Sequence, residues 1–139
     1  MGAVGGTLTT LTNDGVISGG AGTAQGAGLL NSGNIITRIT NSGTISGGSY
    51  GFVNSAGSAI TTLTSGTGAI ISGLTYYGVY NGGTITTITN GGSITCGLIG
   101  VANVAGSILT TLTNTGFIFG DAIAISGGAM TTLANPGPA

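Results

Sequence analysis

Charge is almost absent from this sequence. Its 139 residues include one arginine, Arg38, and two aspartates, Asp14 and Asp121, but no lysine, glutamate, histidine or tryptophan. Charged residues make up 2% of the chain, against about 25% in ordinary globular domains. With a formal net charge of −1, the chain has no basic patch of the kind that nucleic acid or an anionic membrane surface requires. We therefore expect no nucleic-acid partner.

The groups that carry most enzymatic chemistry are also missing. A nucleophilic serine or threonine needs an adjacent base, and the chain has neither histidine nor lysine. A glycosidase needs two carboxylates about 5–9.5 Å apart, but Asp14 and Asp121 fall in the first and fifth of the repeats described below. We interpret Asp14 as a turn residue and Asp121 as a solvated loop residue. The sequence therefore predicts no catalytic residues, no cofactor and no metal site.

Cysteine and long hydrophobic runs are scarce as well. Cys96 is the only cysteine, so no internal disulfide can form, and we interpret it as a small buried side chain rather than a reactive thiol. No apolar run approaches the roughly 20 residues of a membrane-spanning helix, so we expect no membrane insertion by this segment. The stretch 1–6 lacks the basic start and apolar centre of a signal peptide. The repeat is in phase by Thr7, which suggests a piece of a longer repeat array with an added Met.

What the sequence does contain is a repeat. A threonine-rich row, first seen as Thr7-Leu-Thr-Thr-Leu-Thr-Asn13, returns five times. Its second apolar residue recurs at spacings of 28, 24, 25, 24 and 21 residues. The six positions are Leu11, Ile39, Leu63, Ile88, Leu112 and Leu133. A period in this range is typical of a solenoid.

Each repeat has three parts. The threonine-rich row ends at an Asn-x-Gly turn, except in the third repeat, which has Ser65-Gly-Thr-Gly68. A short strand centred on one isoleucine follows, as in Thr44-Ile-Ser46. The third part is a Gly-apolar-x-Asn segment, such as Gly51-Phe-Val-Asn54, and the longest intervening loop is Gly19 to Gly28.

These parts predict strands, because threonine and isoleucine are β-branched and glycine or asparagine recurs too often for helices. We expect an all-β fold: a right-handed parallel β-helix with three short strands per coil, about 24 residues per coil and about five coils. Residues 1–139 would form a single β-solenoid domain. Equivalent side chains would stack at about 4.8 Å per coil, with an asparagine ladder at the turns.

Three apolar ladders are expected in the interior. The first comprises the six positions of the repeat given above. The second comprises Ile17, Ile45, Ile71, Ile94 and Ile118, and the third Leu29, Phe52, Val79, Val101 and Ile123.

The position of Arg38 orients the threonine-rich row. An unpaired arginine is too costly to bury, so its column should face water while Ile39 faces inward. Keeping Leu8 inward as well as Leu11 then requires a bend or bulge near Thr9.

The outer side of the row is the candidate contact surface, since it is neutral and rich in hydroxyl groups. Phe117 and Phe119 flank the inward Ile118 and should point outward, which suggests a patch that a partner covers. The candidate contact residues are Thr10, Thr12, Thr62, Thr64, Thr87, Thr89, Thr111, Thr113, Phe117 and Phe119.

The pattern Ile-Thr-Thr-Leu-Thr-Asn-x-Gly-x-Ile-Ser-Gly, followed by Gly-Val-x-Asn, resembles the repeats of bacterial autotransporter (type V secreted) adhesin passenger domains. Ile36–Gly47 and Ile85–Asn90 match it best, and the resemblance extends from Thr7 to Gly137. It implies a secreted β-helix on the bacterial cell surface that mediates adhesion, self-association or biofilm formation. The family has no shared catalytic residues to carry over. The implied partners are other copies of the chain or a host or abiotic surface.

Two alternatives remain open. Rows in the same phase at both ends favour a head-to-tail filament, although Pro136 and Pro138 lack the donors that such a ladder needs. Thr-x-Thr triplets on a flat sheet resemble insect-type antifreeze faces and favour ice binding, although Arg38 and Ala134 interrupt the rows.

Overall fold

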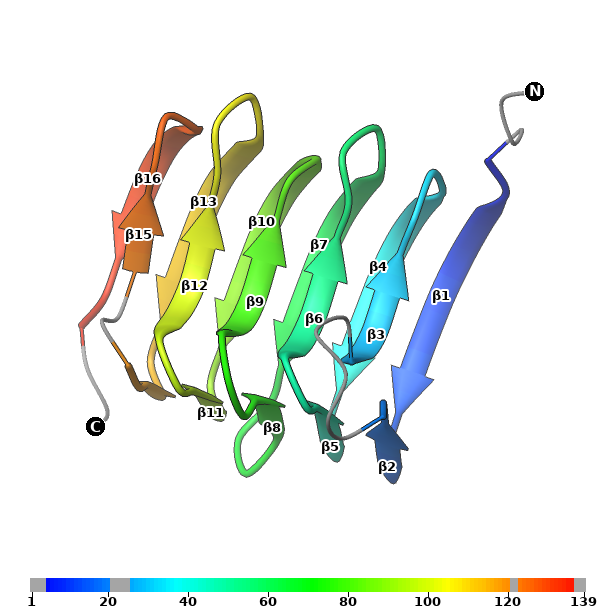
Figure 1. The fold of residues 1–139 in the computed structure, drawn as a ribbon, viewed down its shortest axis with the longest axis vertical. Coiled ribbons are helices and arrows are strands. Elements are labelled where there is room, and N and C mark those ends of the chain that lie inside the picture. Colours follow the sequence, from blue (N-terminus) through cyan, green and yellow to red (C-terminus); the bar gives the residue numbers. More distant parts are fainter. Residues whose placement is uncertain (1–4, 21–25, 121–122, 137–139) are drawn as a thin grey trace.

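The computed structural model describes residues 5–20, 26–120 and 123–136. All the regular elements in these residues are β-strands, and they form three parallel sheets of six, five and five strands. The chain descends the far sheet in Figure 1, crosses the lower edge, climbs the near sheet and returns over the top, advancing one step per circuit. This sense of winding is right-handed. The predicted right-handed parallel β-helix, with three strands per coil and about five coils, is therefore confirmed.

Sheet A is formed by the threonine-rich rows. Its strands, in spatial order, are β1 (Thr7–Asn13), β4 (Ile35–Asn41), β7 (Ala59–Ser65), β10 (Thr84–Asn90), β13 (Ile108–Asn114) and β16 (Ala129–Ala134).

Sheets B and C complete each coil. Sheet B contains β2 (Val16–Ser18), β5 (Thr44–Gly47), β8 (Ile70–Gly73), β11 (Ser93–Cys96) and β14 (Phe117–Ile118). Sheet C contains β3 (Ala27–Asn31), β6 (Tyr50–Asn54), β9 (Tyr77–Asn81), β12 (Ile99–Asn103) and β15 (Ile123–Ile125).

The strands stack with equivalent residues side by side. Leu11 pairs with Ile39, and Ile39 with Leu63, as the repeat predicts. Ile36 and Ile39 are buried while Thr37 and Arg38, between them, are exposed. In every pair of neighbouring sheet A strands, the residues equivalent to Leu8 pair with each other, and so do the residues equivalent to Thr10. The residues equivalent to Thr9 do not pair. The bend expected near Thr9 and the outward orientation of Arg38 are both confirmed.

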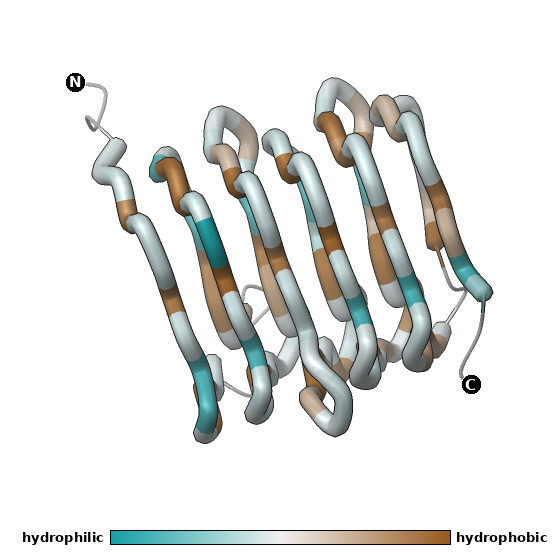
Figure 2. Tube along the Cα trace, turned by 180° about the vertical axis from the view of Figure 1, so that it is seen from behind, coloured by the Kyte–Doolittle hydropathy of each residue, from teal (hydrophilic) through white to brown (hydrophobic). Residues whose placement is uncertain are grey.

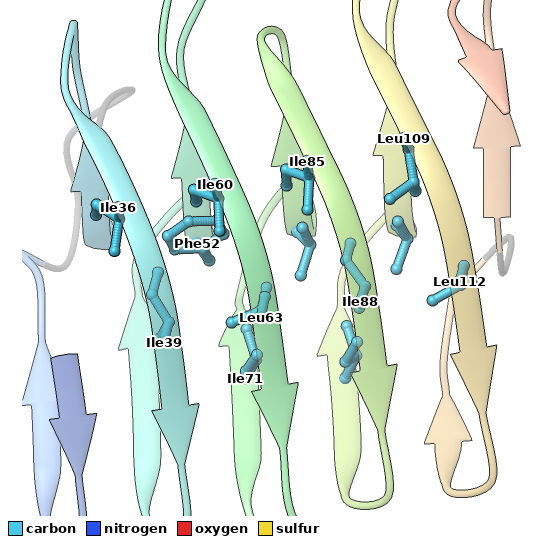
Figure 3. Packing of buried hydrophobic residues seen from close by; sticks show 13 residues of the cluster. Ile36, Ile39, Phe52, Ile60, Leu63, Ile71, Ile85, Ile88, Leu109 and Leu112 are labelled. Carbon is cyan, nitrogen blue, oxygen red and sulfur yellow. The ribbon is translucent and has the colours of Figure 1, made fainter. Parts of the chain in front are cut away.

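The three apolar ladders contribute to one hydrophobic core, which also contains Ile36, Ile60, Ile85 and Leu109, the equivalents of Leu8 (Figure 3). The ladder members in the middle coils, such as Ile39, Ile71 and Val79, are completely buried. The ladder members in the first coil, and Ile118 and Ile123 in the fifth, are partly buried. The prediction was wrong for Leu133, which pairs with Leu112 but is 51% exposed. Leu133 lies on the last strand of sheet A, so no described strand covers its far side.

Two asparagine ladders run along the turns, as predicted. In the first, Asn13 Nδ2 donates to Asn41 Oδ1 at 2.8 Å, and Asn90 Nδ2 to Asn114 Oδ1 at 2.7 Å. The second ladder is continuous through Asn31, Asn54, Asn81 and Asn103, with Nδ2 to Oδ1 distances of 2.9, 2.9 and 2.8 Å. The Nδ2 groups of Asn13, Asn41, Asn54, Asn81, Asn90 and Asn103 each also donate to a main-chain carbonyl of the next coil. The ladders therefore satisfy turn carbonyls that lie outside the strands.

The first ladder is broken where Ser65 replaces asparagine. Ser65 pairs with Asn41 on one side and with Asn90 on the other. Ser65 Oγ and Asn90 Oδ1 are both buried and have no hydrogen-bond partner. The serine side chain is too short to bridge two coils, so the break follows directly from the residue type.

The glycine that opens each sheet C segment allows close contact between sheets B and C. A Cβ atom on Gly78 would lie 2.3 Å from Ile94 Cγ2, and one on Gly51 would lie 2.8 Å from Ile71 Cγ2. Real Cβ atoms do not approach other atoms so closely, so a larger residue would force the sheets apart. This contact explains the Gly-apolar-x-Asn segment of the repeat.

Candidate contact surfaces

The outer side of sheet A is a regular array of threonine side chains, which we call the threonine face. It consists of three rows that run across the strands. In Figure 2 the pale stretch between the two hydrophobic bands of sheet A corresponds to the first two rows, and the third row follows the second band. The first row is Thr9, Thr37, Thr61, Thr86, Thr110 and Thr131. The second is Thr10, Arg38, Thr62, Thr87, Thr111 and Thr132. The third is Thr12, Thr40, Thr64, Thr89, Thr113 and Ala134.

The structure brings all eight predicted threonines together on this face. Thr62 pairs with Thr87, and Thr87 with Thr111, so the predicted triplets lie side by side in three successive coils. The described residues of the face carry one charge, that of Arg38, in the second row. Sequence reasoning missed the Thr9 row as part of the surface. Its signal was visible, because threonine occupies that position in all six rows.

The two predicted phenylalanines form an exposed pair beside sheet B. Phe117 and Phe119 are 49% and 50% exposed, and their rings stack with centroids 5.7 Å apart. Their outward orientation is confirmed, and the described chain leaves about half of each side chain uncovered. Cys96 is half-buried rather than buried, and its S–H donates to the Phe119 carbonyl oxygen at 2.9 Å. Cys96 occupies the position that Gly73 holds one coil earlier.

The four tyrosines gather into a single cluster, which we call the tyrosine cluster. Tyr50, at the start of β6, contacts Tyr76, Tyr77 and Tyr80, with ring centroids 5.9, 5.6 and 5.8 Å away. The pKa of Tyr50 is raised above 10.0, chiefly because the side chain is partly buried. The neighbouring phenol groups of Tyr77, Tyr80 and Tyr76 raise it further. Tyr50 is therefore uncharged at neutral pH. The cluster lies on the outer side of sheet C, since the neighbours Gly51 and Phe52 are buried.

The tyrosine cluster was not expected from the sequence, in which these residues look scattered. A signal existed in the alignment of the repeats, because Tyr50 and Tyr77 both directly precede the glycine of the third part. The structure pairs them side by side. Tyr80 lies in the neighbouring outward row, beside Val53.

One of the two aspartates, Asp14, lies in the part of the chain that the structure describes. No group of three or more His, Cys, Asp or Glu side chains that could hold a metal ion occurs in this part of the chain. Asp14 is exposed at the turn after β1 and accepts a hydrogen bond from Ser42 Oγ. Asp121 lies outside the described residues. None of the described elements is a helix long and apolar enough to span a bilayer.

Comparison with protein-family models, curated proteins and solved structures finds no match to this chain. Evidence for function therefore comes from the surfaces themselves and from the repeat pattern.

Proposed function

We propose that this chain is a non-catalytic adhesive β-solenoid, and that its threonine face binds other copies of the chain or an ordered surface outside the cell. The observation that carries the proposal is the alignment of the threonine rows across six strands. A hydroxyl group both donates and accepts hydrogen bonds. Two such faces are therefore chemically complementary to each other in an isologous, two-fold arrangement.

The low charge of the chain supports homotypic contact. A net charge close to zero removes the long-range repulsion that keeps most soluble proteins apart. Each threonine also presents a methyl group, so contact between two faces would bury apolar area as well as pair hydroxyls. Because the stacking of strands fixes the rows, little additional ordering is needed on binding.

The bacterial cell surface is the location that the repeat pattern favours. The resemblance to autotransporter passenger repeats extends over nearly the whole chain, and it supports a secreted protein that functions in adhesion or biofilm formation. Long arrays of such coils would present the same threonine rows over a greater length. Many weak contacts in register would then give strong attachment.

The direct test is to place like charges on the threonine face. Thr37→Lys, Thr86→Lys and Thr131→Lys lie in alternate strands of the exposed first row. Their spacing of about 9.6 Å is near the screening length in physiological salt, so their effect on folding should be small. In a paired face these charges would be brought against a surface that carries the same three charges. Since like-charge juxtaposition costs several kcal/mol, we expect the dissociation constant for self-association to rise more than about 100-fold.

The matched control carries the same added charge on exposed turns: Ser32→Lys, Thr67→Lys and Ala105→Lys. Sedimentation velocity across a concentration series should show association of the wild-type chain and of the control, but not of the face variant. Association of all three proteins to the same extent would exclude the threonine face as the contact. A wild-type chain that stays monomeric, and that also fails to adsorb to cells or to abiotic surfaces, would contradict the proposed function.

End-to-end stacking is a second candidate, supported by one buried atom. Asn31 Oδ1 begins the second asparagine ladder and is buried without a hydrogen-bond partner. It borders an open hollow of about 290 Å³ that is also lined by Leu8, Leu11 and Leu29. A donor from another coil would satisfy this oxygen. The numbers of strands argue against this arrangement, because sheet A has one more strand than sheets B and C. If β1 of one copy paired with β16 of another, sheets B and C would each lack one strand at the junction. Uniform filaments of the wild type and the face variant in electron micrographs would favour this arrangement over lateral contact.

Ice binding is a third candidate for the same face. Thr62-Leu-Thr64, Thr87-Ile-Thr89 and Thr111-Leu-Thr113 form an uninterrupted block of paired triplets in three coils. Within the block the hydroxyls repeat about every 4.8 Å across the strands, which gives a rigid two-dimensional lattice. Thermal hysteresis that disappears in a Thr87→Lys variant but persists in the Thr67→Lys variant would support this role. Absence of hysteresis in the wild-type chain would exclude it.

A further inference from the structure

A hollow of about 300 Å³ opens beside the tyrosine cluster on the outer side of sheet C. Its lining residues are Ala27, Leu30, Tyr50, Val53, Ser55 and Tyr80. They come from β3, from β6 and the turn after it, and from β9. The site is separate from the threonine face, which belongs to sheet A.

The hollow arises from a change in residue size along two rows. In one row the small Ala27 is paired with the large Tyr50 of the next coil. In the neighbouring row Leu30 is followed by Val53 and then by Tyr80. The two tyrosines therefore form a raised wall, and the smaller side chains on the β3 side form its floor.

The wall is supported by the contact between its own two rings and by Tyr77. Tyr50 and Tyr80 contact each other edge to face, with centroids 5.8 Å apart and ring planes 71° apart. Tyr77 contacts both of them, at 5.6 Å in each case. Rings held by such contacts have lost much of their rotational freedom before a ligand arrives, which lowers the entropic cost of binding.

The chemistry of the lining specifies a neutral ligand with both apolar and hydroxyl surfaces. None of the lining residues is charged. The two charged side chains among the described residues lie elsewhere, with Arg38 on the threonine face and Asp14 at the turn after β1. The phenol rings and Leu30 offer apolar contact, while the hydroxyls of Tyr50, Tyr80 and Ser55 offer hydrogen bonds.

We propose that this hollow binds a sugar ring of a neutral saccharide. A pyranose has a face of C–H groups, which packs on a phenol ring, and a rim of hydroxyls, which pairs with tyrosine and serine oxygens. A purely apolar ligand would leave the hydroxyls of the lining unpaired. An anionic ligand would find no cation in the site. The proposal does not rest on self-association through the threonine face.

The chain provides its own spectroscopic probe. It contains no tryptophan, and all four of its tyrosines belong to the cluster. Intrinsic fluorescence therefore reports on this site. The wild-type chain would be titrated with cellobiose, maltose and N,N′-diacetylchitobiose, and binding would be checked by saturation-transfer NMR. We expect a saturable change with at least one of these disaccharides.

Variants locate the binding to the hollow. Tyr80→Ala removes the wall and should raise the dissociation constant at least about tenfold, as truncation of a central aromatic contact typically does. Tyr80→Phe keeps the ring and should retain most of the affinity. Tyr76→Ala is the matched control, since Tyr76 contacts Tyr50 but does not line the hollow, and it should bind like the wild type. Thermal unfolding followed by circular dichroism verifies that each variant folds.

Three results would overturn the proposal. The first is no saturable response to any of the three disaccharides by either method. The second is an equal loss of affinity in the folded Tyr80→Ala and Tyr76→Ala variants. The third is tighter binding of a uronic-acid disaccharide than of cellobiose, which would point to an anionic ligand. The triple lysine variant of the threonine face should bind the saccharide normally, so failure of one proposal is distinguishable from failure of the other.

Discussion

Replacement of Phe52 by alanine is expected to lower the free energy of unfolding by about 3–5 kcal/mol. Phe52 is completely buried in the second coil (Figure 3). It pairs with Leu29 on one side and with Val79 on the other, both members of the third ladder. Its ring is the largest fully buried side chain among the described residues. Truncation would remove its apolar contacts and leave a cavity that the stacked strands on either side are too rigid to fill.

The matched control is the same substitution at an exposed position. Phe117→Ala deletes the same atoms, but the Phe117 side chain is 49% exposed, so its effect should be well below that at Phe52. Urea unfolding followed by circular dichroism at neutral pH gives both values. Equal losses at the two positions would mean that the ladders do not form the core.

Most of the fold was predictable because the coils repeat. In a parallel stack in register, every residue lies beside its equivalents, so the environment of Ile39 also describes those of Leu63 and Ile88. One decisive residue can then orient a whole row. Arg38 did this for sheet A, since an unpaired charge must face water.

The predictions that were wrong concern positions where the repetition ends or varies. Leu133 was predicted to be interior, but it is the last member of its ladder, and among the described residues it has a ladder neighbour on one side only. Cys96 was predicted to be buried, but it occupies a position held by glycine in the preceding coil and remains half-buried. Neither environment can be read from the pattern of the other coils.

The surfaces were less predictable than the core. The threonine rows were recognised because one residue type repeats at fixed positions. The tyrosine cluster combines two rows and a loop residue, Tyr76, and its members do not share one repeat position. Which rings meet depends on the geometry of neighbouring rows, and the period along the chain does not specify it.

The asparagine ladders lead to the second large effect. Asn81→Ala should lower the free energy of unfolding by at least about 3 kcal/mol, since several buried polar groups would lose a partner at once. Asn81 Nδ2 donates to Asn103 Oδ1 at 2.8 Å and to the Ile108 carbonyl at 2.9 Å. Asn81 Oδ1 accepts from Asn54 Nδ2 at 2.9 Å. Alanine can replace none of these bonds, and water has little access to a site that is completely buried.

The end of the first ladder provides a control, and its break provides the converse experiment. Asn135→Ala removes an exposed terminal acceptor, bonded to Asn114 Nδ2 at 2.8 Å, and should lower the free energy of unfolding much less than Asn81→Ala does.

Ser65→Asn should instead stabilise the chain by about 1 kcal/mol, because an amide at this position can donate to the unpaired Asn90 Oδ1 and accept from Asn41. Urea unfolding measures all three variants. If continuity of the ladders stabilises the fold, Ser65→Asn, which completes the first ladder, should raise the stability. Asn81→Ala, which interrupts the second ladder, should lower it. A loss of stability in Ser65→Asn comparable to that in Asn81→Ala would instead mean that the turns are limited by space, and that the amide hydrogen bonds are secondary to packing.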